Sequence, residues 1–277
     1  MNERRNYVNG RVVIITGASG GFGALAAEML AERGAKVVLA ARSEEKLAAL
    51  AEKIRAKGGE VVYRRTDVSK KEDMFALAEL AVESFGAIDV LVNNAGTMPL
   101  SYFSGHEMAL EAWEQCIDTS IKGTLYGICA VYDQMMDQGR GQIINVSSIY
   151  GNYPIAGAGV YQVAKMGVQY LAESLRSECQ GKIKVSVIKP SGFTRTGLQD
   201  TMVDSMAGGG LVGDLPAIGD QLENMTGRPD YHDINNIHYC DPDPEILAEN
   251  IVYAIDQPWG ISIGDLTVRA SGDLYVL

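Results

Sequence analysis

The chain has 277 residues, of which 47% are hydrophobic, and it carries a formal net charge of −11 at pH 7. This apolar content can bury a sizeable core, and because no break in composition divides the sequence we expect one domain. The acidic balance disfavours phosphate-rich nucleic acid and anionic membranes as partners.

Short β-branched runs alternate along the chain with longer helical patterns. The runs predict strands at 11–16, 36–41, 60–65, 88–93, 142–147, 184–189 and near 261–268. Helical patterns occupy 44–57, 70–84, 107–137, 160–179 and 243–256. Nearly continuous apolar strands are typical of parallel sheets covered on both faces. The alternation therefore predicts a Rossmann-type, doubly wound α/β fold of about seven parallel strands with helices on both faces.

A glycine-rich turn, "IITGASGGFG", joins the first predicted strand to a helix. Its glycines at 17, 21 and 23 allow a tight turn and a close approach of the backbone to a phosphate at the helix N-terminus. Such a turn alone is weak evidence, because a plain strand-to-helix connection uses the same residues. Its position after the first strand favours a dinucleotide site.

The end of the second strand, "VVLAARS", bears on the choice between NAD and NADP. Ala41 stands where NAD enzymes carry an acidic residue, and Arg42 follows it. A guanidinium can pair with a 2′-phosphate, whereas a carboxylate would repel it. The pattern indicates NADP(H); the alternative is a solvated arginine at a strand end.

The segment "YQVAK" sets Tyr161 and Lys165 one helical turn apart, on the same helix face. Without further context, such a pair is more often an ordinary helix surface. A free tyrosine is a poor base at neutral pH because its pKa is about 10. A nearby ammonium favours the phenolate, so we expect Lys165 to lower the pKa of Tyr161.

Five motifs occur in one order: "TGASGGFG" (16–23), "DV" (67–68), "NNAG" (93–96), "NVSS" (145–148) and "YQVAK" (161–165). Tyr161 lies thirteen residues after Ser148. In these features the chain resembles the classical short-chain dehydrogenase/reductase family, closely over about 10–195 and more loosely over 243–270.

The resemblance implies an NADP(H)-dependent oxidoreductase that interconverts a secondary alcohol and a ketone. Tyr161 would exchange a proton with the substrate oxygen, Ser148 would hydrogen-bond that oxygen, and Lys165 would also reach the ribose of the cofactor. The implied cofactor-binding residues are Gly17, Ser19, Gly21, Phe22, Gly23, Arg42, Asp67, Val68, Asn93, Ala95, Gly96, Tyr161, Lys165, Pro190, Phe193 and Thr194.

The chain departs from the family pattern at two points of the site. Ser120 stands seven residues after Trp113, where the family has an asparagine thought to hold a water in a proton relay to the lysine. A hydroxyl is shorter but can donate and accept, so Ser120 is a candidate catalytic residue, with plain helix packing as the alternative. "PSGFTRT" replaces PGxVxT, which leaves Thr194 or Thr196 as the cofactor contact; we favour Thr194.

The single domain, 1–277, divides into an N-terminal extension (1–10), a cofactor-binding and catalytic core (11–190), a substrate-binding lid segment (191–242) and a last helix, strand and tail (243–277). A long Gly-, Asp- and Asn-rich segment is typical of a functional lid. Its methionines and aromatic residues suit a bulky apolar substrate such as a hydroxysteroid or bile acid, but equally lid packing or a subunit contact. A 3-oxoacyl thioester, a small carbonyl compound or a sugar remains open.

Three other classes compete with this hypothesis: a non-catalytic NADP(H)-binding regulator, an extended-type epimerase or dehydratase, and an oligomeric scaffold. The first would not need Ser148, Tyr161 and Lys165 together, the second is usually longer, and the third lacks a repeat. We expect no metal, because His232 and His238 have no companion ligands in the sequence. The resemblance implies a homotetramer or homodimer formed through the fourth and fifth helices.

The sequence also bears on the cellular location. Its four cysteines are widely spaced and form no CxxC motif, which is typical of reduced thiols. The apolar run near the N-terminus is too short for a signal peptide or a membrane span. We therefore expect a soluble cytoplasmic protein with a small-molecule substrate.

Overall fold

The computed structural model describes residues 6–192, 195–207, 229–240 and 242–273. Within these residues, seven parallel strands form one sheet in the order β3-β2-β1-β4-β5-β6-β7. The strands are β1 (Val12–Thr16), β2 (Lys36–Ala41), β3 (Glu60–Arg65), β4 (Val90–Asn93), β5 (Gly141–Val146), β6 (Ile183–Pro190) and β7 (Asp265–Val268). The order reverses between β1 and β4, which is where doubly wound sheets bind ligands. The predicted fold is confirmed.

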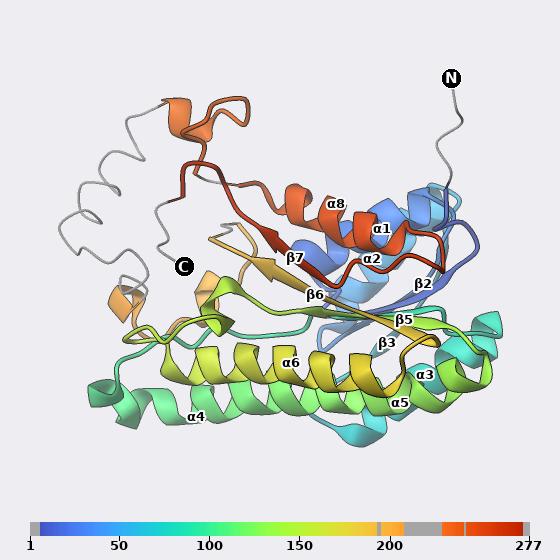
Figure 1. Ribbon diagram of the computed structural model, residues 1–277, viewed down its shortest axis with the longest axis horizontal. Helices are drawn as coiled ribbons and strands as arrows, with labels where there is room; N and C mark the ends of the chain where they lie inside the picture. Colours follow the sequence, from blue (N-terminus) through green and yellow to red (C-terminus); the bar gives the residue numbers. More distant parts are fainter. Residues whose placement is uncertain (1–5, 193–194, 208–228, 241, 274–277) are drawn as a thin grey trace.

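Helices cover both faces of the sheet (Figure 1). One layer holds α1 (Gly21–Glu32), α2 (Glu44–Ala56) and α8 (Pro244–Ile255). The opposite layer holds α3 (Lys71–Phe85), α5 (Gly123–Asp137) and α6 (Gly159–Glu178), and α4 (His106–Ile117) lies beside α6. Each face is therefore sealed from water, as the apolar strands require.

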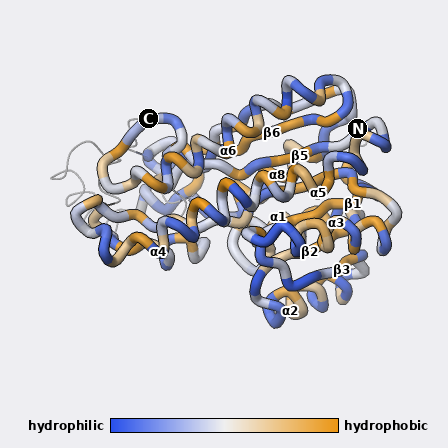
Figure 2. The backbone as a smooth tube through the Cα atoms, turned by 90° about the horizontal axis from the view of Figure 1, so that it is seen from below, coloured by the Kyte–Doolittle hydropathy of each residue, from blue (hydrophilic) through white to orange (hydrophobic). Residues whose placement is uncertain are grey.

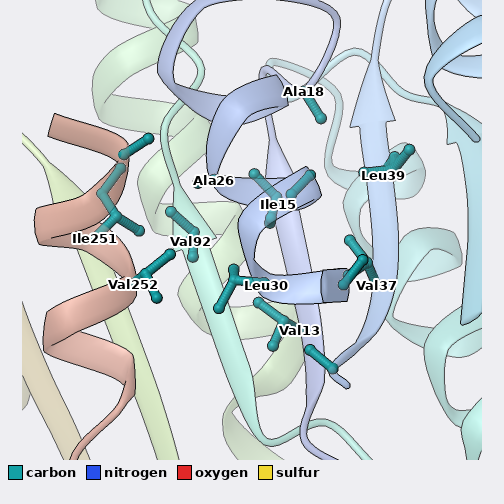
Figure 3. Close-up of a cluster of buried hydrophobic side chains, with 14 of the residues drawn as sticks. Val13, Ile15, Ala18, Ala26, Leu30, Val37, Leu39, Val92, Ile251 and Val252 are labelled. Atoms are coloured by element: carbon teal, nitrogen blue, oxygen red, sulfur yellow. The ribbon is translucent and has the colours of Figure 1, made fainter. Parts of the chain in front are cut away.

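Alternate residues of the central strands feed two separate cores. Ile15 belongs to one cluster with Leu30 of α1 and Val252 of α8, drawn in Figure 3. Its neighbour Ile14 belongs to the cluster on the other face, with residues of α3 and α5. Figure 2 shows β1 as largely hydrophobic and the edge strand β3 as more hydrophilic, in line with their burial. Burial on both faces thus holds the carboxyl ends of β1, β4 and β5 in fixed positions.

The predicted helix at 107–137 is present without a break, but it is not α-helical throughout. A π-helical turn, η2 (Asp118–Lys122), separates α4 from α5. Such a turn inserts one extra residue into the helix and often marks a functional site. The periodicity of the sequence did not reveal it, because one inserted residue barely changes the apolar pattern. The last strand is also shorter than predicted, since 261–264 lie outside β7.

The carboxyl edge of the sheet carries the connections that matter for function. They include short 3-10 helices η1 (Phe103–Gly105), η3 (Ile149–Gly151), η4 (Gln199–Thr201) and η6 (Pro229–His232). The last two belong to the predicted lid segment. Within the described part of the chain, no helix combines the length and the apolar character needed to cross a membrane.

Candidate active site

A cavity of about 880 Å³ opens at the carboxyl edge of the sheet, where the strand order reverses. Its walls come from the glycine turn after β1, the ends of β2, β4, β5 and β6, the first turns of α6, and the described parts of the lid segment. The cavity therefore brings together motifs that are far apart in the sequence.

The glycine turn forms the floor of this cavity. Gly17 and Gly21 both have positive φ angles, +68° and +52°, which favour glycine. A Cβ on Gly17 would lie 2.9 Å from the Cα of Ala95. Gly17, Ser19, Gly21 and Phe22 all line the cavity, as expected.

Gly23 has a different role from the other glycines of the turn. It does not line the cavity, and a Cβ there would lie 2.6 Å from the Gly17 carbonyl oxygen. Asn94 fixes this region, because its Nδ2 donates to the Thr16 carbonyl at 3.0 Å. Gly23 thus permits the close packing of α1 beneath the turn.

One end of the cavity is lined by Arg42, Ser43, Lys46, Asp67 and Val68. We call it the adenosine end, after the cofactor contacts that the family resemblance predicts for Arg42, Asp67 and Val68. Burial raises the pKa of Asp67, but hydrogen bonds from the Ser69 hydroxyl and backbone, with the charges of Arg42 and Lys70, outweigh burial and lower it. Sequence reasoning identified Arg42 but missed Lys46, although its position four residues later on α2 was a usable signal.

Ser148, Tyr161 and Lys165 meet in the wall of the cavity. Ser148 follows β5, and the other two lie on the first turns of α6. The side chains of Ser148 and Tyr161 are hydrogen-bonded to each other. The Lys165 ammonium donates to the Val146 carbonyl at 3.0 Å and lies 5.8 Å from the centre of the Tyr161 ring. All three are at least 95% buried.

The protonation of this cluster differs from the prediction. Burial raises the pKa of Tyr161, and the hydrogen bond with Ser148 offsets only part of this rise. Burial also lowers the pKa of Lys165 to about 8. The expected lowering of the Tyr161 pKa by Lys165 is therefore wrong for this structure, because loss of water disfavours the charged form of both groups. Near neutral pH the phenol holds its proton and can act as a donor.

Ser120 lies in the π-helical turn behind this cluster. It is 1% exposed, does not line the cavity, and its hydroxyl makes no well-formed hydrogen bond within the described residues. A Cβ on Gly96 would lie 3.4 Å from the Lys165 ammonium and 3.9 Å from the Ser120 hydroxyl. Ser120 is thus near Lys165, as the motif comparison implied. The Ser120 hydroxyl faces the Cys116 thiol, a weak partner, which leaves room for a function beyond helix packing.

The remaining predicted residues separate into three groups. Ala95, Gly96 and Pro190 line the cavity. Asn93 lies beneath it, where its Nδ2 donates to Asn145 Oδ1 at 2.9 Å, and the next residue, Asn94, lines the wall instead. Phe193 and Thr194 fall outside the described residues. Thr196, the alternative to Thr194, lines the cavity.

Sequence reasoning missed Cys240 and Asp273, which line the cavity from the C-terminal part of the chain. The Gly272 amide donates to the Tyr239 carbonyl at 2.8 Å, which clamps the tail to the lid segment. No local sequence pattern predicts such a long-range contact. The described residues contain no group of three or more His, Cys, Asp or Glu that could hold a metal.

Fold and site together define a doubly wound α/β protein with a buried Ser–Tyr–Lys cluster at the switch point of its sheet. A family model described as short chain dehydrogenase matches residues 11–207. An uncharacterized oxidoreductase of Listeria innocua is 37% identical over 94% of this chain and 96% of its own length. The chain therefore belongs to the short-chain dehydrogenase family and is an oxidoreductase of that family. The resemblance seen in the motifs is confirmed.

Solved structures agree with this assignment. The closed form of serine dehydrogenase complexed with NADP+ has a TM-score of 0.78 at 26% identity, over 96% of this chain and 97% of that chain. A short-chain dehydrogenase/reductase from Burkholderia phymatum in complex with NAD has a TM-score of 0.75 at 26% identity, over 95% and 90% of the two chains. These neighbours differ in the dinucleotide that each one holds.

Proposed function

We propose that this protein is an NADP(H)-dependent oxidoreductase that interconverts a secondary alcohol and a ketone. The observation that carries the proposal is the buried cluster of Ser148, Tyr161 and Lys165 in a cavity floored by the glycine turn. A bound nicotinamide would supply or accept the hydride. The chain's own residues must bind the substrate, polarise its oxygen and move its proton.

The proton step follows from the geometry of the cluster. Tyr161 gives its phenolic proton to the carbonyl oxygen in reduction and takes the hydroxyl proton in oxidation. Ser148, hydrogen-bonded to Tyr161, donates to the same substrate oxygen and stabilises the charge that develops on it. Lys165 holds positive charge beside the phenol while its ammonium is fixed by the Val146 carbonyl.

The glycine floor favours a dinucleotide cofactor. Because its glycines carry no side chain, a phosphate can approach the backbone at the N-terminus of α1. The preference for NADP(H) rests on Arg42, with Ser43 and Lys46 as further donors beside it. One structural neighbour holds NADP+ and another holds NAD. The preference for NADP(H) therefore rests on the basic residues that line the cavity of this protein.

The decisive experiment replaces the phenol alone. Tyr161→Phe removes the proton donor with little change in shape, so kcat should fall about 10²–10⁴-fold, the usual contribution of general acid catalysis. NADPH binding, followed by its fluorescence, should be retained. Tyr170→Phe is the matched control, because this tyrosine lies on the same helix and is 70% exposed.

The same experiment separates the enzyme from the non-catalytic regulator. An unchanged rate in Tyr161→Phe would refute the Ser–Tyr–Lys mechanism. Tight NADPH binding by the wild type, with no turnover of any secondary alcohol or ketone, would favour the regulator. A panel of hydroxysteroids, bile acids, 3-oxoacyl thioesters and sugars covers the substrate classes that the sequence left open.

Only some of the described apolar residues that suggested a hydroxysteroid substrate lie in the cavity wall. In the described lid segment, the apolar residues Leu198 and Met202 line the cavity, whereas Met206, Ile234 and Ile237 are exposed. Met98, Leu100 and Tyr150 add apolar surface from outside that segment. A bulky apolar substrate remains a proposal that the panel tests.

We also propose a homodimer or homotetramer built through α4, α5 and α6. These helices lie together on one side of the molecule (Figure 1) and carry exposed apolar residues, among them Met108, Leu125 and Met166. Exposed apolar clusters of this kind commonly mark an interface. Analytical ultracentrifugation of the wild type and of Met108→Lys/Met166→Lys tests this: we expect a dimer or tetramer that the variant weakens.

A further inference from the structure

The end of the cavity opposite the adenosine end is built from segments that hydrogen bonds tie together. We call it the substrate end; its lining residues are Met98, Leu100, Tyr150, Asp200, Thr201, Met202, Ser205, Cys240 and Asp273. The Met98 amide donates to the Thr201 hydroxyl at 2.8 Å, and the Asp204 amide donates to the Leu100 carbonyl at 2.9 Å. These bonds tie residues 201–204 to the loop that follows β4.

Asp273 brings a carboxylate to this wall. The Nε of Arg269 lies 3.2 Å from both of its carboxylate oxygens. Asp273 lines the cavity and Arg269 does not, so the guanidinium approaches from behind. The Asp273 side chain is 6% exposed, against 33% for Arg269. The Asp273 carboxylate is therefore largely buried in this ion pair, beside the cavity wall.

Asp200 adds a second carboxylate, in η4. Within the described residues it makes no hydrogen bond or ion pair, and it lies 3.7 Å from the position of a Cβ on Gly197. The segment 196–201, which ends in η4, runs from Thr196, beside the glycine turn, to Thr201, beside Met98. The Asp200 side chain is exposed to solvent, so its charge lacks a protein partner among the described residues and is partly screened by water.

The basic residues among the described cavity lining lie away from the substrate end. Among the described lining residues, the basic ones are Arg42, Lys46 and Lys165. The first two belong to the adenosine end, and the ammonium of Lys165 is buried against the Val146 carbonyl. An anionic group at the substrate end would meet the exposed carboxylate of Asp200 and the carboxylate of Asp273, which Arg269 partly neutralises, and no basic residue among the described lining residues.

We propose that the substrate end selects a hydroxy or oxo compound that bears an ammonium group, over its uncharged analogue and most strongly over its carboxylate analogue. Asp200 supplies the compensating charge, the Asp273 carboxylate adds an oriented dipole, and the Tyr150 ring offers a surface that attracts cations. This inference rests on the proposed oxidoreductase function and names the charge of its substrate. It disfavours bile acids and phosphate-bearing thioesters within that class.

A matched series of four-carbon compounds tests the proposal: 4-amino-2-butanol, 1,3-butanediol and 3-hydroxybutyrate. Each has a secondary hydroxyl next to a methyl group, and they differ chiefly in charge. Oxidation with NADP+ near neutral pH gives kcat/KM, and the rise in melting temperature of the NADP+-loaded protein reports binding without turnover. We expect the amine to exceed the carboxylate by about tenfold or more in either readout.

Variants connect the preference to the two carboxylates. Asp200→Asn should reduce the amine-to-carboxylate ratio by up to about fivefold, the upper range for one exposed charge. Glu249→Gln, an exposed acidic residue of α8 outside the cavity, should leave the ratio unchanged. Asp273→Asn should act in the same direction as Asp200→Asn and more weakly, because Arg269 already neutralises that charge.

The outcomes distinguish this inference from the proposed function. Equal turnover or equal stabilisation by the amine and the carboxylate would overturn the charge selection and leave the oxidoreductase intact. Absence of any effect of all three compounds, with NADP+ bound, would also overturn it. Loss of NADP+ binding itself would instead remove the proposed function.

Discussion

The two ends of the cavity are built in opposite ways. The adenosine end uses residues that immediately follow two neighbouring strands, such as Arg42 after β2 and Asp67 after β3. The substrate end joins Met98, Met202, Cys240 and Asp273, which come from segments more than a hundred residues apart at the extremes. The first end is fixed by the sheet and the second by contacts among loops.

This difference explains why one end carries a chemical signature in the sequence and the other does not. A dinucleotide phosphate requires backbone amides and glycines in a fixed local order, so its residue types are constrained one by one. A substrate wall needs only a net shape and charge, which many loop sequences supply. Experiments should therefore be able to alter each end separately.

The largest effect is expected at the adenosine end. Replacing Arg42 and Lys46 together by alanine removes both cations near a 2′-phosphate, each of which contributes a charge-assisted hydrogen bond of about 1.5–3 kcal/mol. We expect kcat/KM for NADP+ to fall at least about 100-fold, while the value for NAD+ changes by less than about threefold. Initial rates with both dinucleotides measure this.

Lys71→Ala is the control, because this lysine is exposed on α3 and outside the cavity. The amine-to-carboxylate preference of the double variant should stay at the wild-type value. Parallel loss with NADP+ and NAD+ would contradict the assignment of Arg42. A change in substrate charge preference would show that the two ends are coupled rather than separate.

The next effect concerns Lys165, at the junction between the two ends. Its pKa is lowered to about 8 in the folded protein, below the unfolded value of 10.5, because it is buried. Between these two values the unfolded chain binds more protons, so the contribution of Lys165 to stability rises with pH across about pH 8–10. At neutral pH the folded protein carries the cost of a buried ammonium.

Lys165→Met should remove both the cost and its pH dependence. We compare the unfolding free energy of the variant with that of the wild type at each pH. This difference should be about 2 kcal/mol more in favour of the variant at pH 7 than at pH 9.5. Denaturant unfolding at the two pH values measures this, and Lys71→Met serves as the exposed control. An identical difference at both pH values would mean that the ammonium is not desolvated. The same variant should lose activity, so stability and function oppose each other at this residue.

The fold was largely predictable from the sequence, for a physical reason. Strands covered on both faces must be apolar throughout, and β2 and β3 have the predicted bounds. The motif residues Gly17, Ser148, Tyr161 and Lys165 indeed line one cavity.

What the sequence could not reveal depends on three-dimensional surroundings. The predicted sign of the Tyr161 pKa shift was wrong. Burial raises this pKa, and burial depends on the whole fold rather than on neighbouring residues in the sequence. The π-helical turn at Ser120 leaves almost no trace in the periodicity of the helix. Asp273 reaches the cavity through a long-range clamp at Gly272, which no motif encodes.

The smallest effect is expected at Ser120, which lies behind both ends. Its hydroxyl is buried without a well-formed hydrogen bond within the described residues. Removing it in Ser120→Ala should leave stability unchanged or raise it by up to about 1 kcal/mol, since an unpaired polar group is then no longer buried. If Ser120 takes part in the proton relay, kcat should nevertheless fall about two- to fivefold, a small part of the usual general acid–base contribution.

Ser186→Ala provides the matched control for this prediction. The Ser186 hydroxyl is equally buried and unpartnered within the described residues, but it lies on β6 and outside the cavity wall. Both variants should therefore show the same small change in melting temperature, while only Ser120→Ala slows turnover. Equal kcat in the two variants would assign Ser120 to helix packing. A slower Ser120→Ala enzyme would mean that the proton path from Lys165 runs through the π-helical turn, away from both ends of the cavity.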